Sequence, residues 1–339
     1  MKNIIKTIDY TQLKKNAEVI RIMTKTSKLC AVVKSNAYGH GMIKVSKAIE
    51  KWVDYFGVND INEALLLKKH VNRPILILGA CTHQLTPLIR NEIEISVSHI
   101  DELINIEKVA KKLGKCAKIH IALDTGMHRL GTSDETEINE MLKQFRQSKF
   151  LRLVGVFSHL GSGSDKERTS AQIEQFNHLS KNAPTNVTKH IFNSTFFHYN
   201  NIFDMARVGI GLYGYNFPYV TPAMTIKAKI VEIKTVKAAE FIGYGNLHKA
   251  NFDTKIAIIA AGYSDGIPYR WKNGYVLYND KKCPFMADIC MNMSIIKATE
   301  KMKIGDWVTI LGKCDKKFIL ATEIAKKCNT IEDEILVNF

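Results

Sequence analysis

Short apolar runs alternate with longer amphipathic stretches along the first two-thirds of the chain. Helical spacing of apolar residues marks the segments 42–52, 61–70, 100–114 and 136–147. The apolar runs are rich in β-branched residues and predict eight strands, at 28–34, 55–60, 74–80, 94–98, 118–124, 153–159, 189–193 and 206–211. Strands that alternate with helices are typical of parallel βαβ units. The pattern therefore predicts an α/β fold that begins with an N-terminal (β/α)8 TIM-type barrel.

The character of the sequence changes after Pro222. The segments 225–238, 254–263, 274–299 and 305–313 resemble strands separated by Gly, Asn and Asp turns, whereas 321–328 keeps a helical pattern. We therefore expect a smaller β-rich C-terminal domain. The predicted domains are residues 1–222 for the barrel and 223–339 for the β-rich part, with no flexible linker between them.

The composition of the 339 residues, 46% hydrophobic and 24% charged, is that of a globular protein. No apolar run approaches the roughly 20 residues that a transmembrane helix needs, and the N-terminus lacks the apolar core of an export signal. Seven irregularly spaced cysteines include no CxxC pair, which favours reduced thiols over a disulfide or zinc framework. These features predict a cytoplasmic protein without a membrane partner.

The net charge of +15, from 48 Lys and Arg against 33 Asp and Glu, raises the question of nucleic-acid binding. The basic residues are scattered, and no tract of about 5–8 Lys or Arg residues stands out. A lysine-rich surface explains this distribution better than a DNA-binding site, which would have to show tight, salt-dependent affinity. We therefore predict no nucleic-acid partner.

Functional side chains of a (β/α)8 barrel gather where its strands end. The residues at the predicted strand ends are Lys34, Arg129, His159, Asn193, Ser194 and Arg207. A lysine in this place can simply extend to the barrel rim, but a desolvated lysine loses its proton more readily and can form a Schiff base. His159, taken alone, is equally well explained as a hydrogen-bonded histidine of the barrel.

Gly209, Gly211 and Gly214 formally match the dinucleotide-binding fingerprint. That fingerprint must open a helix, whereas two prolines follow here, so the match is rejected. A glycine-rich turn can still bind one phosphate group through its backbone N–H groups. No P-loop, HExxH or calcium-loop motif is present, and we expect no metal. A lysine after the first strand and a phosphate-sized turn after the eighth together suggest pyridoxal 5'-phosphate as cofactor.

Several longer motifs resemble those of the alanine racemases, a family of fold-type III pyridoxal phosphate enzymes. They are VKSNAYGHG (33–41), DTGMHRLG (124–131), RVGIGLYG (207–214), GYSDG (262–266) and CM (290–291), in the family's order along essentially the whole chain. The resemblance implies an isomerase that interconverts L- and D-alanine, supplying D-alanine for cell-wall peptidoglycan. It also implies a homodimer whose subunits share their active sites.

The resemblance assigns the chemistry to residues from both predicted domains. Lys34 would hold the cofactor and act as one catalytic base, and Tyr263 would reach over from the partner subunit as the second. Racemisation needs a base on each face of the substrate, because a single base tends to return the proton to the side it left. Met291, also from the partner subunit, would bind the substrate carboxylate, and Asp333 would line the substrate pocket.

The remaining implied roles concern the cofactor. Its binding residues would be Lys34, Tyr38, Arg129, His159, Asn193, Ser194, Arg207, Gly209 and Ile210. Arg207 would face the ring nitrogen, which must accept a hydrogen bond because arginine stays protonated. This weakens the ring as an electron sink and restrains side reactions. Arg129 would bond the phenolic oxygen and take part in substrate binding, and His159 would connect Tyr263 with Arg207. The phosphate would be bound by Tyr38, Ser194, Gly209 and Ile210.

Four positions depart from the family pattern. Ala122 stands where a carbamylated lysine often orients the arginine that matches Arg129, so another anion or a rearranged Arg129 is expected. Asp288 replaces a usual arginine, Asn292 a usual aspartate and Asp333 a pocket tyrosine. A smaller pocket residue with acceptor oxygens would leave room for a hydroxyl, and two carboxylates would favour cationic side chains. Serine or a basic amino acid is therefore an alternative substrate to alanine.

Two other functions on the same barrel are further alternatives. Fold-type III decarboxylases use the same cofactor, but they are usually longer and carry an acidic partner for the ring nitrogen, where this chain has Arg207. Non-catalytic cofactor-carrier proteins lack the β-rich domain that contains Tyr263. Both differences favour the racemase.

Overall fold

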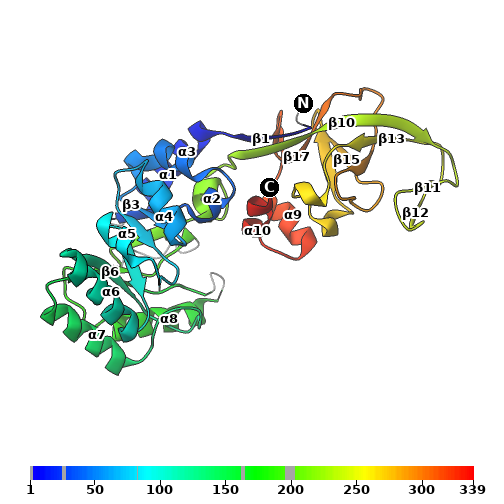
Figure 1. Cartoon of the computed structure of the whole chain (residues 1–339). Helices are drawn as coiled ribbons and strands as arrows, with labels where there is room; N and C mark the ends of the chain where they lie inside the picture. Colours follow the sequence, from blue (N-terminus) through cyan, green and yellow to red (C-terminus); the bar gives the residue numbers. More distant parts are fainter. Residues whose placement is uncertain (1–2, 25–27, 82, 162–164, 195–202) are drawn as a thin grey trace. The chain divides into compact units, whose positions relative to one another are not determined.

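The computed structural model describes residues 3–24, 28–81, 83–161, 165–194 and 203–339. The chain divides into two compact units. The first, called the barrel unit below, contains Leu13–Ala37 and Gly41–Val220. The second, called the β unit, contains Met1–Gln12, Tyr38–His40 and Thr221–Phe339. In Figure 1 most of the barrel unit is coloured blue to green, and most of the β unit yellow to red.

Eight parallel strands form a nearly closed barrel in the barrel unit, in the order β8-β7-β6-β5-β4-β3-β2-β9. Their bounds are β2 (Lys28–Val32), β3 (Tyr55–Val58), β4 (Ile75–Ile77), β5 (Glu94–Val97), β6 (Ala117–Ala122), β7 (Leu151–Phe157), β8 (Thr188–His190) and β9 (Met205–Val208). Beside the two end strands, Asp204 N donates to Lys189 O at 2.9 Å and Arg207 N donates to Phe192 O at 3.0 Å. All eight predicted strands and the predicted (β/α)8 architecture are confirmed.

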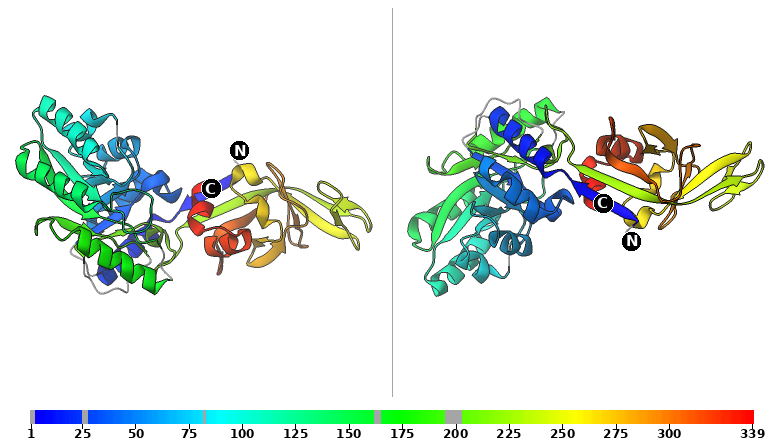
Figure 2. Two further views of the ribbon diagram at one scale, coloured as in Figure 1. Left: turned by 90° about the horizontal axis from the view of Figure 1, so that it is seen from below. Right: turned by 90° about the horizontal axis from the view of Figure 1, so that it is seen from above.

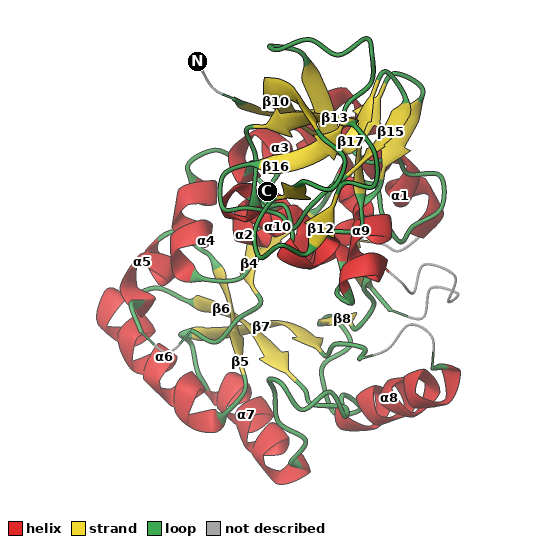
Figure 3. Cartoon of the chain, turned by 90° about the vertical axis from the view of Figure 1, so that its right-hand side faces the viewer, coloured by secondary structure: helices red, strands yellow, loops and turns green. Residues whose placement is uncertain are grey.

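Helices cover the outside of this barrel, as Figure 3 shows for α4 to α8. The helical segments up to residue 213 are α1 (Tyr10–Thr24), α2 (Lys34–Tyr38), α3 (Met42–Ile49), η1 (Glu50–Trp52), α4 (Ile61–Lys68), α5 (Leu85–Arg90), α6 (Ile100–Leu113), α7 (Glu135–Gln147), α8 (Lys166–Leu179) and η3 (Ile210–Tyr213). Four of them begin after an aspartate whose carboxylate accepts backbone N–H bonds, namely Asp9, Asp60, Asp134 and Asp165.

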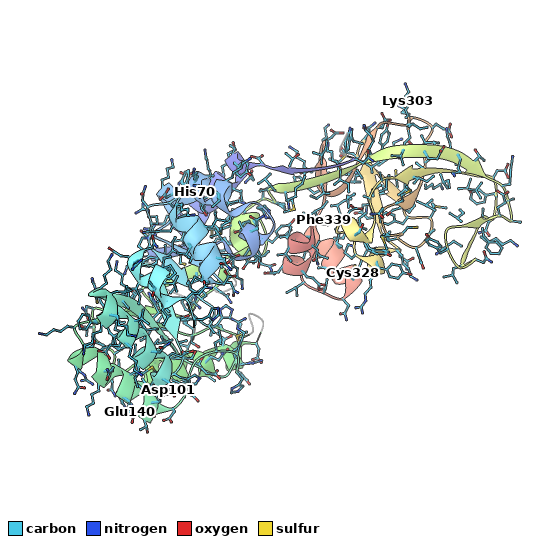
Figure 4. All side chains as sticks on the ribbon, in the orientation of Figure 1. His70, Asp101, Glu140, Lys303, Cys328 and Phe339 are labelled. Carbon is cyan, nitrogen blue, oxygen red and sulfur yellow. The ribbon has the colours of Figure 1, made fainter. Side chains whose placement is uncertain are left out.

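The outer helices are amphipathic. In α6, Leu103, Ile106 and Ala110 are buried, whereas Asp101 is exposed, as is Glu140 on α7 (Figure 4). Burying one apolar stripe per helix covers the parallel sheet and leaves the charged side chains in water. None of the helices in the described ranges is long and apolar enough to span a membrane.

Antiparallel strands build the β unit. The main sheet has the order β15-β14-β17-β10-β13-β16, with β1 on β10 and β18 on β17, and β11 and β12 pair separately. The bounds are β1 (Ile4–Ile8), β10 (Met224–Val236), β11 (Phe241–Ile242), β12 (His248–Lys249), β13 (Thr254–Ile259), β14 (Tyr275–Tyr278), β15 (Lys281–Pro284), β16 (Ser294–Lys297), β17 (Trp307–Cys314) and β18 (Lys317–Ile319). The predicted β-rich C-terminal part is confirmed.

Short helices complete the β unit: η4 (Tyr263–Asp265), η5 (Tyr269–Trp271), α9 (Ala321–Cys328) and α10 (Glu332–Asn338). The last two are the red C-terminal helices in Figure 2. Residues 4–8 pair with β10 and so belong to this sheet, although they lie inside the range 1–222 predicted for the barrel. Apart from these residues, the predicted domain boundary between residues 222 and 223 stays a prediction.

Candidate active site

Lys34 lies two residues past the end of β2, is half-buried, and precedes an unusual segment of backbone. The next four residues, Ser35, Asn36, Ala37 and Tyr38, have φ angles of 52°, 52°, 57° and 51°. Left-handed backbone costs an L-residue roughly 1–2 kcal/mol, so four such residues in succession form a strained turn. Strain of this kind persists only where surrounding contacts enforce it.

Hydrogen bonds within the barrel unit hold this turn in place. Glu63 uses both carboxylate oxygens: Oε1 accepts from Ser35 N at 2.6 Å, and Oε2 accepts from Asn59 N at 2.9 Å. Asn36 Oδ1 accepts from Met42 N at 2.9 Å, which ties the turn to the start of α3. These bonds fix the direction in which the chain leaves Lys34.

Arg207 is buried on β9, with 3% of its surface exposed, and its described acceptors are all uncharged. NH1 donates to His190 Nδ1 at 2.7 Å and to His190 O at 2.9 Å. NH2 donates to Ser158 O at 2.5 Å and lies 3.5 Å from His159 Nδ1. Burial lowers the pKa of Arg207 to about 10, which leaves the guanidinium charged at neutral pH. The site thus contains a fixed, buried cation able to donate to a ring nitrogen.

His159 lies within electrostatic reach of three cations. Burial, followed by the charges of Arg207, Arg129 and Lys34, lowers the pKa of His159 to about 3. Its imidazole is therefore neutral in the physiological range and can accept a hydrogen bond. The structure brings these four residues together in the barrel unit.

A cluster of donors lies where β9 ends. Ser194 Oγ accepts from Gly209 N at 3.0 Å and from Gly211 N at 3.4 Å. Ser194 and Ile210 are buried and Asn193 is half-buried. A hydroxyl and converging backbone N–H groups form a donor set that suits a phosphate group. Together with a half-buried lysine and a buried arginine, they fit the chemistry of pyridoxal 5'-phosphate.

Arg129 is exposed in the loop that follows β6, and Asp124 organises that loop. Asp124 Oδ1 accepts from the backbone N–H groups of Gly126, Met127 and His128, at 2.9, 3.1 and 3.0 Å. Burial acts to raise the pKa of Asp124, but hydrogen bonds from His128 and Gly126 lower it overall. Ala122 is buried on β6 and has only a methyl group, so the position of Arg129 depends on its loop.

Tyr263 and Met291 lie together in the β unit. Tyr263 N donates to Cys290 O and Ser264 N donates to Met291 O, both at 3.0 Å. Asn292 Nδ2 donates to Ser264 Oγ at 2.7 Å and so stabilises the same pair of segments. The side chains of Tyr263 and Met291 are 44% and 55% exposed. The residues predicted as second base and as carboxylate ligand are therefore presented on one exposed surface of this unit.

Tyr38 and Asp333 also belong to the β unit. Burial, followed by the negative charge of Asp333, raises the pKa of Tyr38. Asp333 is half-buried in the first turn of α10. Its negative charge thus helps to keep the hydroxyl of Tyr38, which was predicted to bind phosphate, protonated.

Asp288 is buried, and three partners share its carboxylate. Lys272 Nζ lies 3.4 Å from Oδ1, His248 Nε2 lies 3.3 Å from Oδ1, and Tyr269 donates its hydroxyl to Oδ2 at 3.1 Å. The negative charge is balanced inside this cluster. Asp288 therefore does not support the expectation that a free carboxylate here attracts cationic substrates.

Two residues that hold Arg207 most closely, His190 and Ser158, were not predicted from the sequence. His190 could have been predicted as a strand-end residue, because β8 ends there and not at the predicted residue 193. Ser158 acts through its carbonyl oxygen, so no side-chain signal points to it.

Comparisons with known proteins agree with this geometry. Residues 8–217 match the alanine racemase N-terminal domain family, and residues 223–339 match the alanine racemase C-terminal domain family. The alanine racemase of Methanococcus maripaludis is 34% identical, over 97% of this chain and 94% of the relative. The solved alanine racemase from Streptomyces lavendulae superimposes with a TM-score of 0.94 at 26% identity, over 100% of this chain and 95% of the other. The alanine racemase from Bartonella henselae with covalently bound pyridoxal phosphate gives a TM-score of 0.90 at 26% identity, over 100% and 97%.

Proposed function

The chain belongs to the alanine racemase family, and we propose that it interconverts L- and D-alanine with Lys34 and Tyr263 as the two proton-transferring groups. It is an amino-acid racemase, an isomerase. The observation that carries the proposal furthest is that Lys34, Arg129 and Arg207 all lie within electrostatic reach of His159 in the barrel unit. The same unit contains the turn in which Ser194 Oγ accepts from Gly209 N. A lysine at a strand end, close to buried or fixed cations, can hold an aldehyde cofactor, and the glycine-rich turn can hold its phosphate group. This combination favours a phosphorylated aldehyde as cofactor.

That cofactor is pyridoxal 5'-phosphate, which when bound would withdraw electrons from the substrate and acidify its Cα–H bond. Lys34 would hold it covalently, as the covalently bound cofactor of the Bartonella henselae relative suggests. Ser194, Tyr38 and the N–H groups of Gly209 and Ile210 would bind its phosphate. Arg129 would bond its phenolic oxygen from the loop that Asp124 organises.

Proton transfer would use one residue on each face of the substrate carbon. Lys34 would accept or return the proton on one face and Tyr263 on the other, so that each direction of racemisation begins at a different base. The exposed side chains of Tyr263 and Met291 would serve a second copy of the chain. We therefore propose a homodimer in which the β unit of one subunit completes the site of the other.

Arg207 would limit side reactions. Its guanidinium stays charged and can only donate, so the group that it faces must accept a hydrogen bond. A ring nitrogen that accepts, and does not carry its own proton, stabilises negative charge less strongly. Proton return to the substrate carbon is then favoured over transamination.

Serine is the second candidate substrate, because Asp333 brings a carboxylate to the neighbourhood of Tyr38. A site that hydrogen-bonds a substrate hydroxyl discriminates strongly against analogues that lack it, whereas one methylene is worth only about 1–3 kcal/mol. A basic amino acid is less well supported as substrate, because Lys272 and His248 balance the charge of Asp288.

The test is product chirality. Pure protein supplied with the cofactor and L-alanine should yield D-alanine, and parallel incubations with L-serine and L-lysine should rank the substrates. An unchanged L-enantiomer in all three would contradict the proposal.

Lys34 can be tested in the same preparation. Borohydride reduction should fix a pyridoxyl group on the Lys34 peptide, because reduction makes the lysine–cofactor bond permanent. Lys34→Ala should lose this label, whereas the exposed control Lys44→Ala on α3 should keep it. A label on a different lysine would refute the assignment.

A further inference from the structure

A chain of buried hydrogen bonds runs through the interior of the barrel and ends at Arg207. Glu94 Oε2 lies 2.7 Å from His120 Nε2, His120 Nδ1 lies 3.0 Å from His190 Nε2, and His190 Nδ1 lies 2.7 Å from Arg207 NH1. These four residues, called the relay below, are 4%, 0%, 0% and 3% exposed. The interior of such a barrel is normally filled by branched apolar side chains, so a continuous polar chain there calls for a role.

Arg207 sets the direction of every hydrogen bond in the relay. A guanidinium has no acceptor, so His190 Nδ1 must accept and its Nε2 must carry the proton of the neutral ring. His120 Nδ1 then accepts from His190, and its Nε2–H points at Glu94. A protonated Glu94 that donated to His120 would reverse the chain and leave two donors facing each other at Arg207. Glu94 therefore accepts as a carboxylate, and both imidazoles are neutral.

Other contacts agree with this assignment. Burial, followed by the charge of Arg207, lowers the pKa of His190 well below its usual value, which keeps the ring neutral. The hydroxyl of Tyr55 also hydrogen-bonds the Glu94 carboxylate, so a second donor converges on the same anion. Further charge near the relay comes from Lys28, which donates to Thr188 Oγ1 at 2.8 Å.

The barrel makes room for the relay at one glycine. His120 on β6 and His190 on β8 are separated by β7, where Gly155 lies beside His120. A Cβ at Gly155 would lie 2.2 Å from His120 Nδ1, the atom that faces His190. Phe157 stacks on the His190 ring with centroids 5.2 Å apart, and Arg207 Cζ lies 5.4 Å from the Phe157 ring. The missing side chain at Gly155 thus leaves the space that the His120 ring of the relay occupies.

The relay also balances charge. A buried cation needs a counter-charge or a full set of hydrogen bonds, and the described acceptors of Arg207 are neutral carbonyls and imidazoles. One of these acceptors, His190, leads through His120 to the Glu94 carboxylate. Because all hydrogen bonds of the relay point in one direction, each polarises the next. The negative charge of Glu94 thereby stabilises the positive charge of the Arg207 guanidinium.

We propose that Glu94 is a positioning residue for racemisation: acting through His120 and His190, it fixes the Arg207 guanidinium and balances its charge. The geometry of the relay stands independently of the cofactor. The effect on racemisation rests on the proposed function, in which Arg207 faces the cofactor ring.

The relay itself is tested in wild-type protein by nitrogen NMR of histidine-labelled samples. We expect His120 and His190, assigned through His120→Asn and His190→Asn, to be neutral rings protonated at Nε2 from about pH 6 to pH 8, where free histidine titrates. A ring protonated at Nδ1, or at both nitrogens, would overturn the proposal whatever the enzyme's activity.

The positioning role is tested with Glu94→Gln, which keeps an acceptor for His120 but removes the charge. We expect kcat to fall about tenfold or more with little change in KM, and the absorption band of the bound cofactor to shift. Glu94→Asp should recover part of the loss. The matched control is Glu92→Gln, which removes the same charge from the exposed pair of Glu92 with Lys118 (2.8 Å) and should leave both readouts unchanged.

A purely structural role would lower the unfolding temperature of Glu94→Gln yet leave kcat and the cofactor band unchanged below it, and that result would overturn the proposal. Gly155→Ala is a second variant, because its methyl group would displace the His120 ring without removing a polar group. It should lower kcat as well. Wild-type protein without racemase activity but with the expected tautomers would refute the proposed function and leave the relay geometry intact.

Discussion

Burial and the charge of Arg207 together keep two histidines, His159 and His190, neutral. Burial and that charge lower the pKa of His159 to about 3 and the pKa of His190 well below its usual value. A neutral imidazole can accept from the guanidinium, whereas a protonated one would repel it. Folding around Arg207 therefore requires both rings to be without their second proton.

This requirement predicts a loss of stability on acidification. The unfolded chain protonates His159 near pH 6.5 and the folded chain only near pH 3, so between these values the unfolded state binds more protons. Stability from this residue is complete above pH 6.5 and is lost as the pH falls towards 3. From pH 7 to pH 5 the loss should be about 2 kcal/mol for this one histidine.

The measurement is the unfolding free energy from urea titrations at pH 7 and pH 5. His159→Asn should show a smaller decrease than wild type by about 2 kcal/mol, since it removes the titrating ring. His70→Asn, at the exposed histidine labelled in Figure 4, should behave as wild type. Equal pH dependence in wild type and His159→Asn would show that His159 does not carry the effect.

The sequence was sufficient to predict Lys34, His159, Ser194 and Arg207, because polar residues at the ends of apolar runs are easily recognised. Glu94 and His120 were not predicted, for a physical reason. Both occupy strand interiors or starts, where a lone polar residue is as well explained by an exposed position. Their burial follows from how β6, β7 and β8 are placed side by side, which local pattern does not encode.

At the scale of elements, the left-handed turn after β2 is the most unusual feature. The sequence around it, VKSNAYGHG, contains no glycine at 35–38, where four positive φ angles occur. Two hydrogen bonds offset this strain: Glu63 accepts from Ser35 N, and the side chain of Asn36 accepts from Met42 N. The strain is thus stored directly beside Lys34, where it restricts the orientation of that residue.

A branched side chain in this turn should be costly. At φ 52°, Ser35→Val should lower the unfolding free energy by at least about 1 kcal/mol more than Ser35→Ala, because β-branching crowds left-handed backbone. Both variants can be compared by urea unfolding at neutral pH. The same pair at Ser133, which is exposed but outside the left-handed region, should differ much less. A similar difference at both sites would mean that the turn stores no strain.

Elements differed in how far the sequence could predict them. The helices α3, α4, α6, α7 and α9 were predicted from apolar spacing, whereas α1, α2, α5, α8 and α10 were not. α5 has only six residues, and α8 is largely polar, with Thr169, Gln172, Phe176 and Leu179 as its buried positions. β1 was missed because its partner, β10, lies more than 200 residues away in the sequence. Pairing over such distances is decided by the completed sheet.

For the whole molecule, the change of pattern near residue 222 separated two architectures, a parallel barrel and an antiparallel sheet. The predicted chemistry is divided between them: Lys34, Arg129, His159 and Arg207 lie in the barrel unit, and Tyr263, Met291 and Asp333 in the β unit. A site shared between two subunits would explain why the second base sits on an exposed surface of its own unit.

This division predicts which pairs of inactive variants restore activity. Lys34→Ala disables a barrel unit and Tyr263→Ala disables a β unit, so a heterodimer of the two contains one site built from two intact halves. Purified through two different tags, it should show about half of the wild-type kcat per dimer, because one of its two equivalent sites is complete. The matched control combines Lys34→Ala with Arg207→Lys. Both of these lesions lie in barrel units, neither site of that heterodimer is complete, and activity should stay absent. If the first heterodimer is also inactive, each site draws its bases from a single chain; if the control regains activity, the assignment of Lys34 and Arg207 to the same half of the site is wrong.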